Sequence, residues 1–319
     1  MEQGIGAFSV RKRQGIADVA APRPVPRRAI PHFKWRFVRL MRRVPMLKSL
    51  AASADLRSPG VTYANDPRID RVVFICGLHR SGTTLIEDYV HARFDVSALR
   101  ADVPENEGQH LQDVCSEERR FGGPGRFAFS AAMYRELAGL PPGAETRERI
   151  LASWRRYVVG DSPTLLEKSP PNLTRIAWLR ATFPGARFVV MVRDPRAVAE
   201  ATRKWTSATF EELVLHWHTA HAVALAQADP RDTCFIRYED FCADPDATLA
   251  LSPVPRWLAP RPWPLTTSAR FARLADSNAR YLAKCPAVNF GRGIWDAFGY
   301  RLDAPEAGAG PVAAVQLAG

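Results

Sequence analysis

The residues with the clearest capacity for chemistry form the segment Gly77-Leu-His-Arg-Ser-Gly-Thr-Thr84. Its two glycines, Gly77 and Gly82, have the spacing of a P-loop, in which backbone N–H groups and the N-terminus of the following helix hold phosphate oxygens. A nucleoside-triphosphate hydrolase has a lysine directly after the second glycine, whereas this chain has Thr83 there and carries a cation inside the loop, at Arg80. The segment therefore predicts an anion-binding loop without the lysine of an ATPase or a kinase.

Two more basic residues follow apolar runs further along the chain. Arg193 comes after the run 188–192 and precedes Asp194, where a Walker-type enzyme would need an acidic residue for Mg²⁺, so it favours a second phosphate over a metal. The alternative for Arg193 is an arginine that only caps the next helix. Lys168 comes after the run 164–167 and is one of only six lysines among 44 basic residues, so composition alone does not explain its position. The alternative for Lys168 is a surface lysine paired with Glu167.

These residues need a fold that brings their segments together. Continuous apolar runs rich in β-branched residues predict buried strands at 71–76, 164–167, 188–192 and 233–237. Periodic segments predict helices from Thr83, at 172–183, from Asp194 to about Trp205, and at 209–228. This alternation predicts the α/β class, with a P-loop-like parallel β-sheet flanked by helices. Ligands bind beyond the carboxyl ends of such strands, where the loop, Lys168 and Arg193 fall.

Length, composition and charge limit what else the chain can be. Its 319 residues are 46% hydrophobic and 24% charged, which excludes a disordered protein or a fibre. Residues 1–60 contain thirteen Lys or Arg against three Asp or Glu, a net charge of +10 that leaves +1 for the rest of the chain. The basic character belongs to an extension, so a nucleic-acid partner is not expected. We predict a basic arm at 1–60, one α/β domain at 70–303 and a flexible tail at 304–319.

Several segments add narrower expectations. A short cationic amphipathic helix at 33–44 would either contact an anionic membrane surface or cap the main domain. No apolar stretch is long enough to span a membrane, no secretory signal is visible, and five cysteines without metal spacing favour a cytoplasmic protein, with the inner membrane surface as a further location. The Gly-, Pro- and Arg-rich segment 119–142 predicts a lid around one helix, and the five prolines of 253–264 predict no helix there. His216, His218 and His221 have no carboxylate or cysteine at ligand spacing, so no metal site is expected.

Three segments together resemble the sulfotransferase superfamily, and most closely its bacterial members and tyrosylprotein-sulfotransferase-like branch. They are GLHRSGTT, LLEKSPPNLTRIAWLRATFPGARFVVMVRDPRAV and CFIRYEDFCADP, and the resemblance covers roughly residues 70–300. It implies the donor 3′-phosphoadenosine 5′-phosphosulfate (PAPS). The residues that match its 5′-phosphosulfate loop are Arg80, Ser81, Gly82, Thr83 and Thr84.

The resemblance also assigns the 3′-phosphate of the donor. Arg193 matches the arginine that binds it, but the family serine eight residues later is Ala201 in this chain. Either Thr202 takes the place of that serine, or the phosphate rests on Arg193 and another group, for which Arg292 is a candidate.

The resemblance implies sulfuryl transfer by in-line attack of a hydroxyl or amine acceptor. Lys168 matches the lysine on the bridging oxygen, and Arg80 supports the same charge. Glu107 is the first choice for the general base, with Glu105 and His110 as alternatives, although both glutamates could instead cap a helix near Asn106. The acceptor stays open among a small molecule, a lipid, a carbohydrate and a peptide. The rival functions are a nucleotide kinase or NTPase, and an inactive nucleotide-binding protein at a membrane surface.

Overall fold

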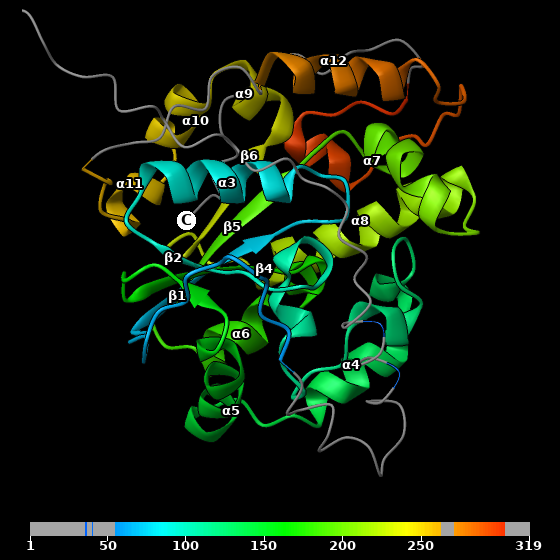
Figure 1. The fold of residues 1–319 in the computed structure, drawn as a ribbon. Helices are drawn as coiled ribbons and strands as arrows, with labels where there is room; N and C mark the ends of the chain where they lie inside the picture. Colours follow the sequence, from blue (N-terminus) through cyan, green and yellow to red (C-terminus); the bar gives the residue numbers. More distant parts are fainter. Residues whose placement is uncertain (1–35, 37–39, 41–54, 263–270, 304–319) are drawn as a thin grey trace, which may run out of the picture. The chain divides into compact units, whose positions relative to one another are not determined.

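A computed structural model describes residues 36, 40, 55–262 and 271–303, without the side chains of 271–276. Its centre is one six-stranded sheet with the order β3-β2-β4-β1-β5-β6. The strands are β1 (Arg71–Cys76), β2 (Ser97–Leu99), β3 (Val158–Val159), β4 (Thr164–Lys168), β5 (Arg187–Val192) and β6 (Thr233–Arg237). The neighbouring strands β2, β4, β1, β5 and β6 run parallel (Figure 1). Strand β3 pairs antiparallel with β2. The four strands predicted from the apolar runs are confirmed, and β2 and β3 are additional.

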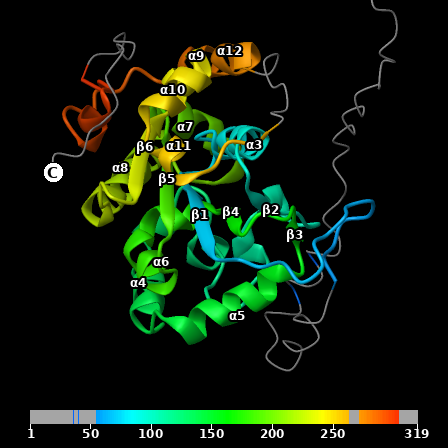
Figure 2. The same cartoon turned by 90° about the vertical axis from the view of Figure 1, so that its left-hand side faces the viewer.

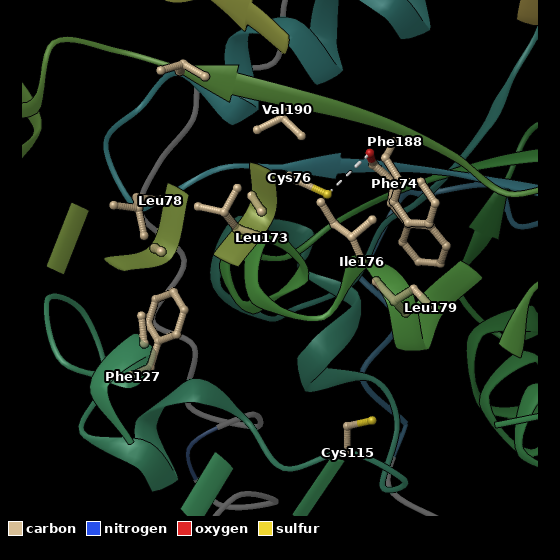
Figure 3. Packing of buried hydrophobic residues seen from close by; sticks show 14 of the residues in the cluster. Phe74, Cys76, Leu78, Cys115, Phe127, Leu173, Ile176, Leu179, Phe188 and Val190 are labelled. Atoms are coloured by element: carbon tan, nitrogen blue, oxygen red, sulfur yellow. Dashed lines mark hydrogen bonds between the residues drawn. The ribbon is translucent and has the colours of Figure 1, made fainter. Parts of the chain in front are cut away.

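Side chains on alternate positions of the strands point into two separate cores. Phe74 and Cys76 of β1 belong to one core, whereas Val73 and Ile75 belong to the other. The first core continues through Phe188 and other buried residues of β5 into the helix at 176–182 (Figure 3). Because both faces of the central strands are buried, these strands appear in the sequence as uninterrupted apolar runs.

Helices cover both faces of the sheet (Figure 2). On the face of the second core lie α3 (Thr83–Arg93), α9 (Tyr238–Ala243), α10 (Pro245–Leu251) and α11 (Val254–Trp257). On the face of the first core lie α4 (Ala131–Ala138), α5 (Ala144–Arg155), α6 (Ile176–Thr182) and α8 (Phe210–Gln227). Helix α7 (Pro195–Thr202) contacts both α8 and α12 (Phe271–Leu282). The predicted flanked α/β sheet is therefore correct.

Short 3₁₀ helices shape the connections, and some replace parts of predicted helices. They are η2 (Pro104–Asn106), η3 (Gly108–His110), η4 (Glu118–Phe121), η5 (Phe127–Phe129), η6 (Pro170–Thr174), η7 (Arg203–Trp205) and η9 (Ile294–Phe298). The helix expected at 172–183 begins as η6, because the non-helical backbone of Arg175 (φ −136°, ψ 26°) separates this first part from α6. The helix expected near Asn106 is wrong, since positive φ angles at Glu105 (49°) and Asn106 (56°) interrupt it.

The segments 253–264 and 119–142 were each expected to have a particular helix content. The prediction of no helix within 253–264 is wrong at α11, because Pro253 and Pro255 lie where the helix begins, and the first N–H groups of a helix have no intrahelical partner to lose. The segment 119–142 contains one α-helix, α4, as predicted.

The terminal segments are described only in part. Of the predicted amphipathic helix at 33–44, only Arg36 and Leu40 are described, and both are helical and exposed. The rest of that helix and the tail at 304–319 lie outside the described residues. Leu56 is buried in the first core, upstream of the expected domain start. No helix in the described parts of the chain is long and apolar enough to cross a membrane.

Candidate active site

The strand order places the predicted site residues on neighbouring strands. Strand β1 lies between β4 and β5, and all three run in the same direction. The Gly77–Gly82 loop follows β1, Lys168 ends β4, and Arg193 follows β5. All three therefore lie at the carboxyl ends of neighbouring parallel strands, as predicted from the sequence.

The loop after β1 is a tight turn that depends on its second glycine. Gly82 has φ of 97° and directly precedes α3, and a Cβ atom there would lie 2.5 Å from the ring of Tyr238. The buried Ser81 hydroxyl donates to the carbonyl of Leu78 at 2.6 Å. The serine side chain thus holds the turn, while the N-terminus of α3 begins at Thr83.

Arg193 is a buried cation that touches the loop. Its Nη1 donates to the carbonyl of Arg80 at 2.8 Å and its Nε to Oδ1 of Asn278 at 3.0 Å, and its guanidinium lies 4.2 Å from the ring centre of Tyr238. The alternative of a helix-capping arginine is wrong, because the side chain of Asp194 caps α7.

Arg80 adopts a positive φ of 68°, which turns its carbonyl toward Arg193. Its Nη2 donates to the hydroxyl of Tyr281 at 3.3 Å, and its guanidinium lies 5.2 Å from the ring of Trp205. Nε of Arg80 and Nη2 of Arg193 are buried and make no hydrogen bond to any residue that the structure describes. Two buried guanidinium nitrogens at the loop therefore lack a hydrogen-bond acceptor within the described part of the chain.

Asn278 and Tyr281 are site residues that the sequence analysis missed. Both lie on α12, more than 80 residues after Arg193 in the chain. Asn278 is oriented by Glu239, which accepts from its amide at 3.3 Å and leaves its carbonyl oxygen for Arg193. Nothing in the sequence near α12 resembles a phosphate motif, so only the packing of this helix on α7 and α9 identifies them.

Lys168 is buried between carboxylates rather than exposed. Its Nζ donates to the carbonyl of Glu105 at 2.9 Å and lies 3.7 Å from Glu87 Oε2 and 3.9 Å from Glu107 Oε1. The alternative of a surface lysine paired with Glu167 is wrong, because adjacent residues of a strand point to opposite faces of the sheet.

The partners of Lys168 belong to a larger buried network. Glu87, on α3, also pairs with Arg100 at 3.1 Å. Burial raises the pKa of Glu87, although the charges of Lys168 and Arg100 act against this. Glu167 accepts instead from the backbone of Gly108 and from the side chains of Ser169 and Asn172.

The three candidate bases have different environments. Glu105 is exposed, and its carboxylate accepts from Oγ1 of Thr84 at 3.4 Å. Glu107 and His110 are buried and form an ion pair at 3.6 Å. Burial raises the pKa of Glu107, but His110 and Lys168 outweigh it and lower the pKa to about 2. Burial lowers the pKa of His110, but Glu107 and Glu117 outweigh it and raise the pKa to about 9. At neutral pH the pair is a carboxylate and an imidazolium.

Two predicted residues remain, Thr202 and Arg292. The hydroxyl of Thr202 is buried, makes no hydrogen bond to a described residue, and lines a small cavity with Leu78, His79 and His216. Arg292 is exposed and lies 3.8 Å from Asp296.

The histidines of α8 serve separate structural contacts. His216 accepts from the backbone of Ala128, His221 contacts the carbonyl of Trp217, and His218 accepts from the backbone of Ile294. Burial lowers the pKa of both His216 and His221 to about 3, so both rings are neutral. Within the described ranges, no group of three or more His, Cys, Asp or Glu could hold a metal ion, and all five cysteines are free thiols.

Comparison with known proteins identifies the family of this chain. Residues 72–251, more than half of it, match the model of the family described as the sulfotransferase family. Protein-tyrosine sulfotransferase 1 of Danio rerio is 26% identical over 226 residues, which are 63% of this chain and 57% of that protein. The chain thus spans little more than half the length of this curated relative.

Solved sulfotransferase structures also match. One from Mycobacterium avium is 17% identical with a TM-score of 0.39, covering 69% of this chain and 70% of its own. One from Alicyclobacillus acidocaldarius is 16% identical with a TM-score of 0.38, covering 69% of this chain and 94% of its own.

Proposed function

The chain belongs to the sulfotransferase family, and from that premise we propose that it transfers a sulfuryl group from PAPS to a hydroxyl or amine acceptor. The observation that carries the proposal is the distance of 3.9 Å between Nζ of Lys168 and Oε1 of Glu107. Lys168 ends the strand next to β1, which the Gly77–Gly82 loop follows. When bound, PAPS supplies a sulfuryl group attached to a phosphate leaving group.

The residues at the loop fit such a donor. The buried N–H groups of Arg80 and Arg193 that bind no described residue are suited to two anionic groups. The backbone of Gly82 and Thr83 at the start of α3 presents N–H groups, with Thr84 adjacent to them. Thr202 is a weaker member of this proposal, because it lines a small cavity with Leu78 and His79 and its hydroxyl makes no hydrogen bond to a described residue.

In this proposal Glu107 and Lys168 each have one task. Glu107 is ionised at neutral pH, so it can take the proton of the acceptor, whereas His110 is already protonated and cannot. Lys168 then donates a hydrogen bond to the leaving oxygen as negative charge develops there. Glu87 and Glu107 are the two carboxylates near Lys168. When Glu107 takes up the proton it loses its negative charge, so Lys168 is attracted less to the protein and can interact more strongly with the leaving oxygen. Glu105, which is exposed at the loop, is the alternative base.

A ligand-binding measurement separates this function from its rivals. The expected product, adenosine 3′,5′-bisphosphate, at 100 times its Kd should stabilise the fold by about 2.7 kcal/mol and raise Tm by several degrees. AMP and ATP·Mg²⁺ should have little effect. A shift with ATP·Mg²⁺ alone would favour a kinase or NTPase. A shift with the bisphosphate but no transfer to any acceptor would favour an inactive nucleotide-binding protein.

We also propose a cytoplasmic location for the enzyme and an acceptor presented at the inner membrane surface. Five free thiols support a cytoplasmic location. The basic segment 33–44 supports contact with the inner membrane surface, and with it a lipid or another acceptor presented there. Co-sedimentation with phosphatidylglycerol vesicles, compared between the full chain and a chain that lacks residues 1–54, tests this. The deletion stops before Leu56 because that side chain is part of the core. Equal sedimentation of the two proteins would exclude the membrane contact.

A further inference from the structure

The two carboxylate oxygens of Glu107 have different surroundings. Oε2 accepts from Nε2 of Gln109 at 2.7 Å and lies 3.6 Å from Nε2 of His110. Oε1 faces Nζ of Lys168 at 3.9 Å. Oε2 is therefore held by Gln109 and His110, whereas Oε1 is directed toward Lys168, the proposed hydrogen-bond donor to the leaving oxygen.

His110 and Gln109 both connect Glu107 to the start of η4, at Glu117 and Glu118. Nδ1 of His110 lies 3.4 Å from Oε2 of Glu117, and Oε1 of Gln109 accepts from the backbone N–H of Glu118 at 3.1 Å. Each nitrogen of the imidazole thus faces a carboxylate. His110 is only 2% exposed, so water screens these contacts little.

The charges around the pair come from three other parts of the fold. Lys168 approaches from β4, and His79, on the loop after β1, adds a weaker effect on Glu107. His79 itself lies 3.7 Å from Glu118. Glu167, on the other face of β4, is close enough to be affected by the charge of Glu107.

A buried carboxylate without such partners would take up a proton and lose its value as a base, because burial disfavours the charged form. An imidazolium held between two carboxylates prevents this. It also orients the group, since Oε2 cannot turn toward the acceptor without losing Gln109 and His110.

We propose that His110 is a positioning residue, itself held by Glu117, which keeps Glu107 ionised and leaves Oε1 as the oxygen that receives the acceptor's proton. The proposal rests on the function proposed above, in which Glu107 is the general base. It assigns His110 a different role from that of an alternative base.

The protonation state of His110 can be measured without any acceptor. Long-range ¹H–¹⁵N NMR of the full chain with labelled histidine reports the charge of each ring, and the resonance that is lost in His110→Gln identifies His110. We expect it to stay doubly protonated at pH 8, with its pKa lowered by at least one unit in both Glu107→Gln and Glu117→Gln. His216 and His221, which are neutral, are internal references. A neutral His110 at pH 7, or a pKa unchanged in Glu107→Gln, overturns the proposal.

The catalytic consequence is a shift of the pH profile. With PAPS as donor and phenol as acceptor probe, whose hydroxyl titrates only at about pH 10, the wild-type kcat/KM should have its acidic limb far below neutral pH. In His110→Gln this limb should move up by one unit or more, because one ionic partner of a carboxylate changes its pKa by roughly 1–3 units. The control His216→Gln removes another buried histidine and should leave the limb in place. Coincident profiles for wild type and His110→Gln overturn the proposal.

The two experiments distinguish the two proposals. If no acceptor is sulfated but the NMR titration behaves as expected, the proposed function fails and the arrangement of Glu107, His110 and Glu117 stands. If transfer occurs and the titration contradicts it, the function stands and His110 is not a positioning residue.

Discussion

Replacement of Lys168 by methionine tests the proposed mechanism most directly. The change keeps most of the side-chain volume but removes the ammonium group that donates to the carbonyl of Glu105 and lies within 4 Å of Glu87 and Glu107. Loss of one hydrogen-bond donor to a transition-state charge typically lowers kcat by about 10²–10³. We expect a decrease of that size, with the affinity for adenosine 3′,5′-bisphosphate changed little.

The same substitution should also reduce stability. Removing one partner of a buried ion pair typically costs about 3–5 kcal/mol, and we expect the lower end because Glu87 keeps Arg100 and Glu107 keeps His110. The pKa of Glu87 is already raised in the fold and should rise further without the lysine. A raised carboxyl pKa destabilises the fold as pH rises through it, so the variant should differ from wild type less at pH 5 than at pH 8.

The assays are kcat at saturating donor and thermal unfolding at both pH values. Lys284→Met, which removes an exposed lysine, is the control and should behave as wild type in both. In Lys168→Met/Glu87→Gln the uncompensated carboxylate is gone, so stability should recover in part while kcat stays low. The mechanism is refuted if Lys168→Met keeps a kcat within a few-fold of wild type, or if the double variant regains activity together with stability.

Three further predictions concern the loop and the buried pair. Arg193→Met should weaken binding of adenosine 3′,5′-bisphosphate about 10–150-fold by calorimetry, the equivalent of about 1.5–3 kcal/mol for a hydrogen bond to a charged group. It should weaken AMP binding less, through the lost bond to the carbonyl of Arg80 alone, and equal losses for both ligands would contradict a 3′-phosphate site. Gly82→Ala forces a Cβ atom to 2.5 Å from Tyr238 at a φ of 97°, so Tm should fall by several degrees and bisphosphate binding should be lost, and an unaltered Tm would show that the turn adapts. The raised pKa of His110 contributes stability that is complete below about pH 6.5 and is lost as pH rises through about 9, so the stability difference between wild type and His110→Gln should shrink from pH 6 to pH 10 in urea unfolding, whereas a constant difference would argue against the ion pair.

The central fold was predictable because its strands are buried on both faces. Strands β1, β4, β5 and β6 are long enough for their apolar runs to be distinctive, and the residues that follow β1, β4 and β5 could be assigned to one edge of the sheet. Strands β2 and β3, of three and two residues, carry no pattern that separates them from a loop. They form because neighbouring backbone groups need partners, which is a property of the assembled sheet.

The candidate site was predictable only for residues next to a strand end. Asn278 and Tyr281 reach it through the packing of α12, and Glu87 lies within a helix whose sequence does not reveal a buried charge. The left-handed conformation of Glu105 and Asn106, which replaces the expected helix and directs a carbonyl at Lys168, has no glycine to signal it. Tertiary contacts select these conformations against the local preference of the residues.

The hydrogen bond from Arg193 to the carbonyl of Arg80 has a consequence for ligand recognition. It joins the two proposed anion sites through one peptide group, so the loop and the guanidinium are preorganised as a unit. A ligand that carries both anionic groups at the matching separation loses its translational and rotational freedom once when it binds this unit. Two separate anions would each lose theirs. The sites should therefore favour a bridged bisphosphate over any mixture of its fragments, and a substitution on α12 that moves either arginine should be felt at both ends of the ligand.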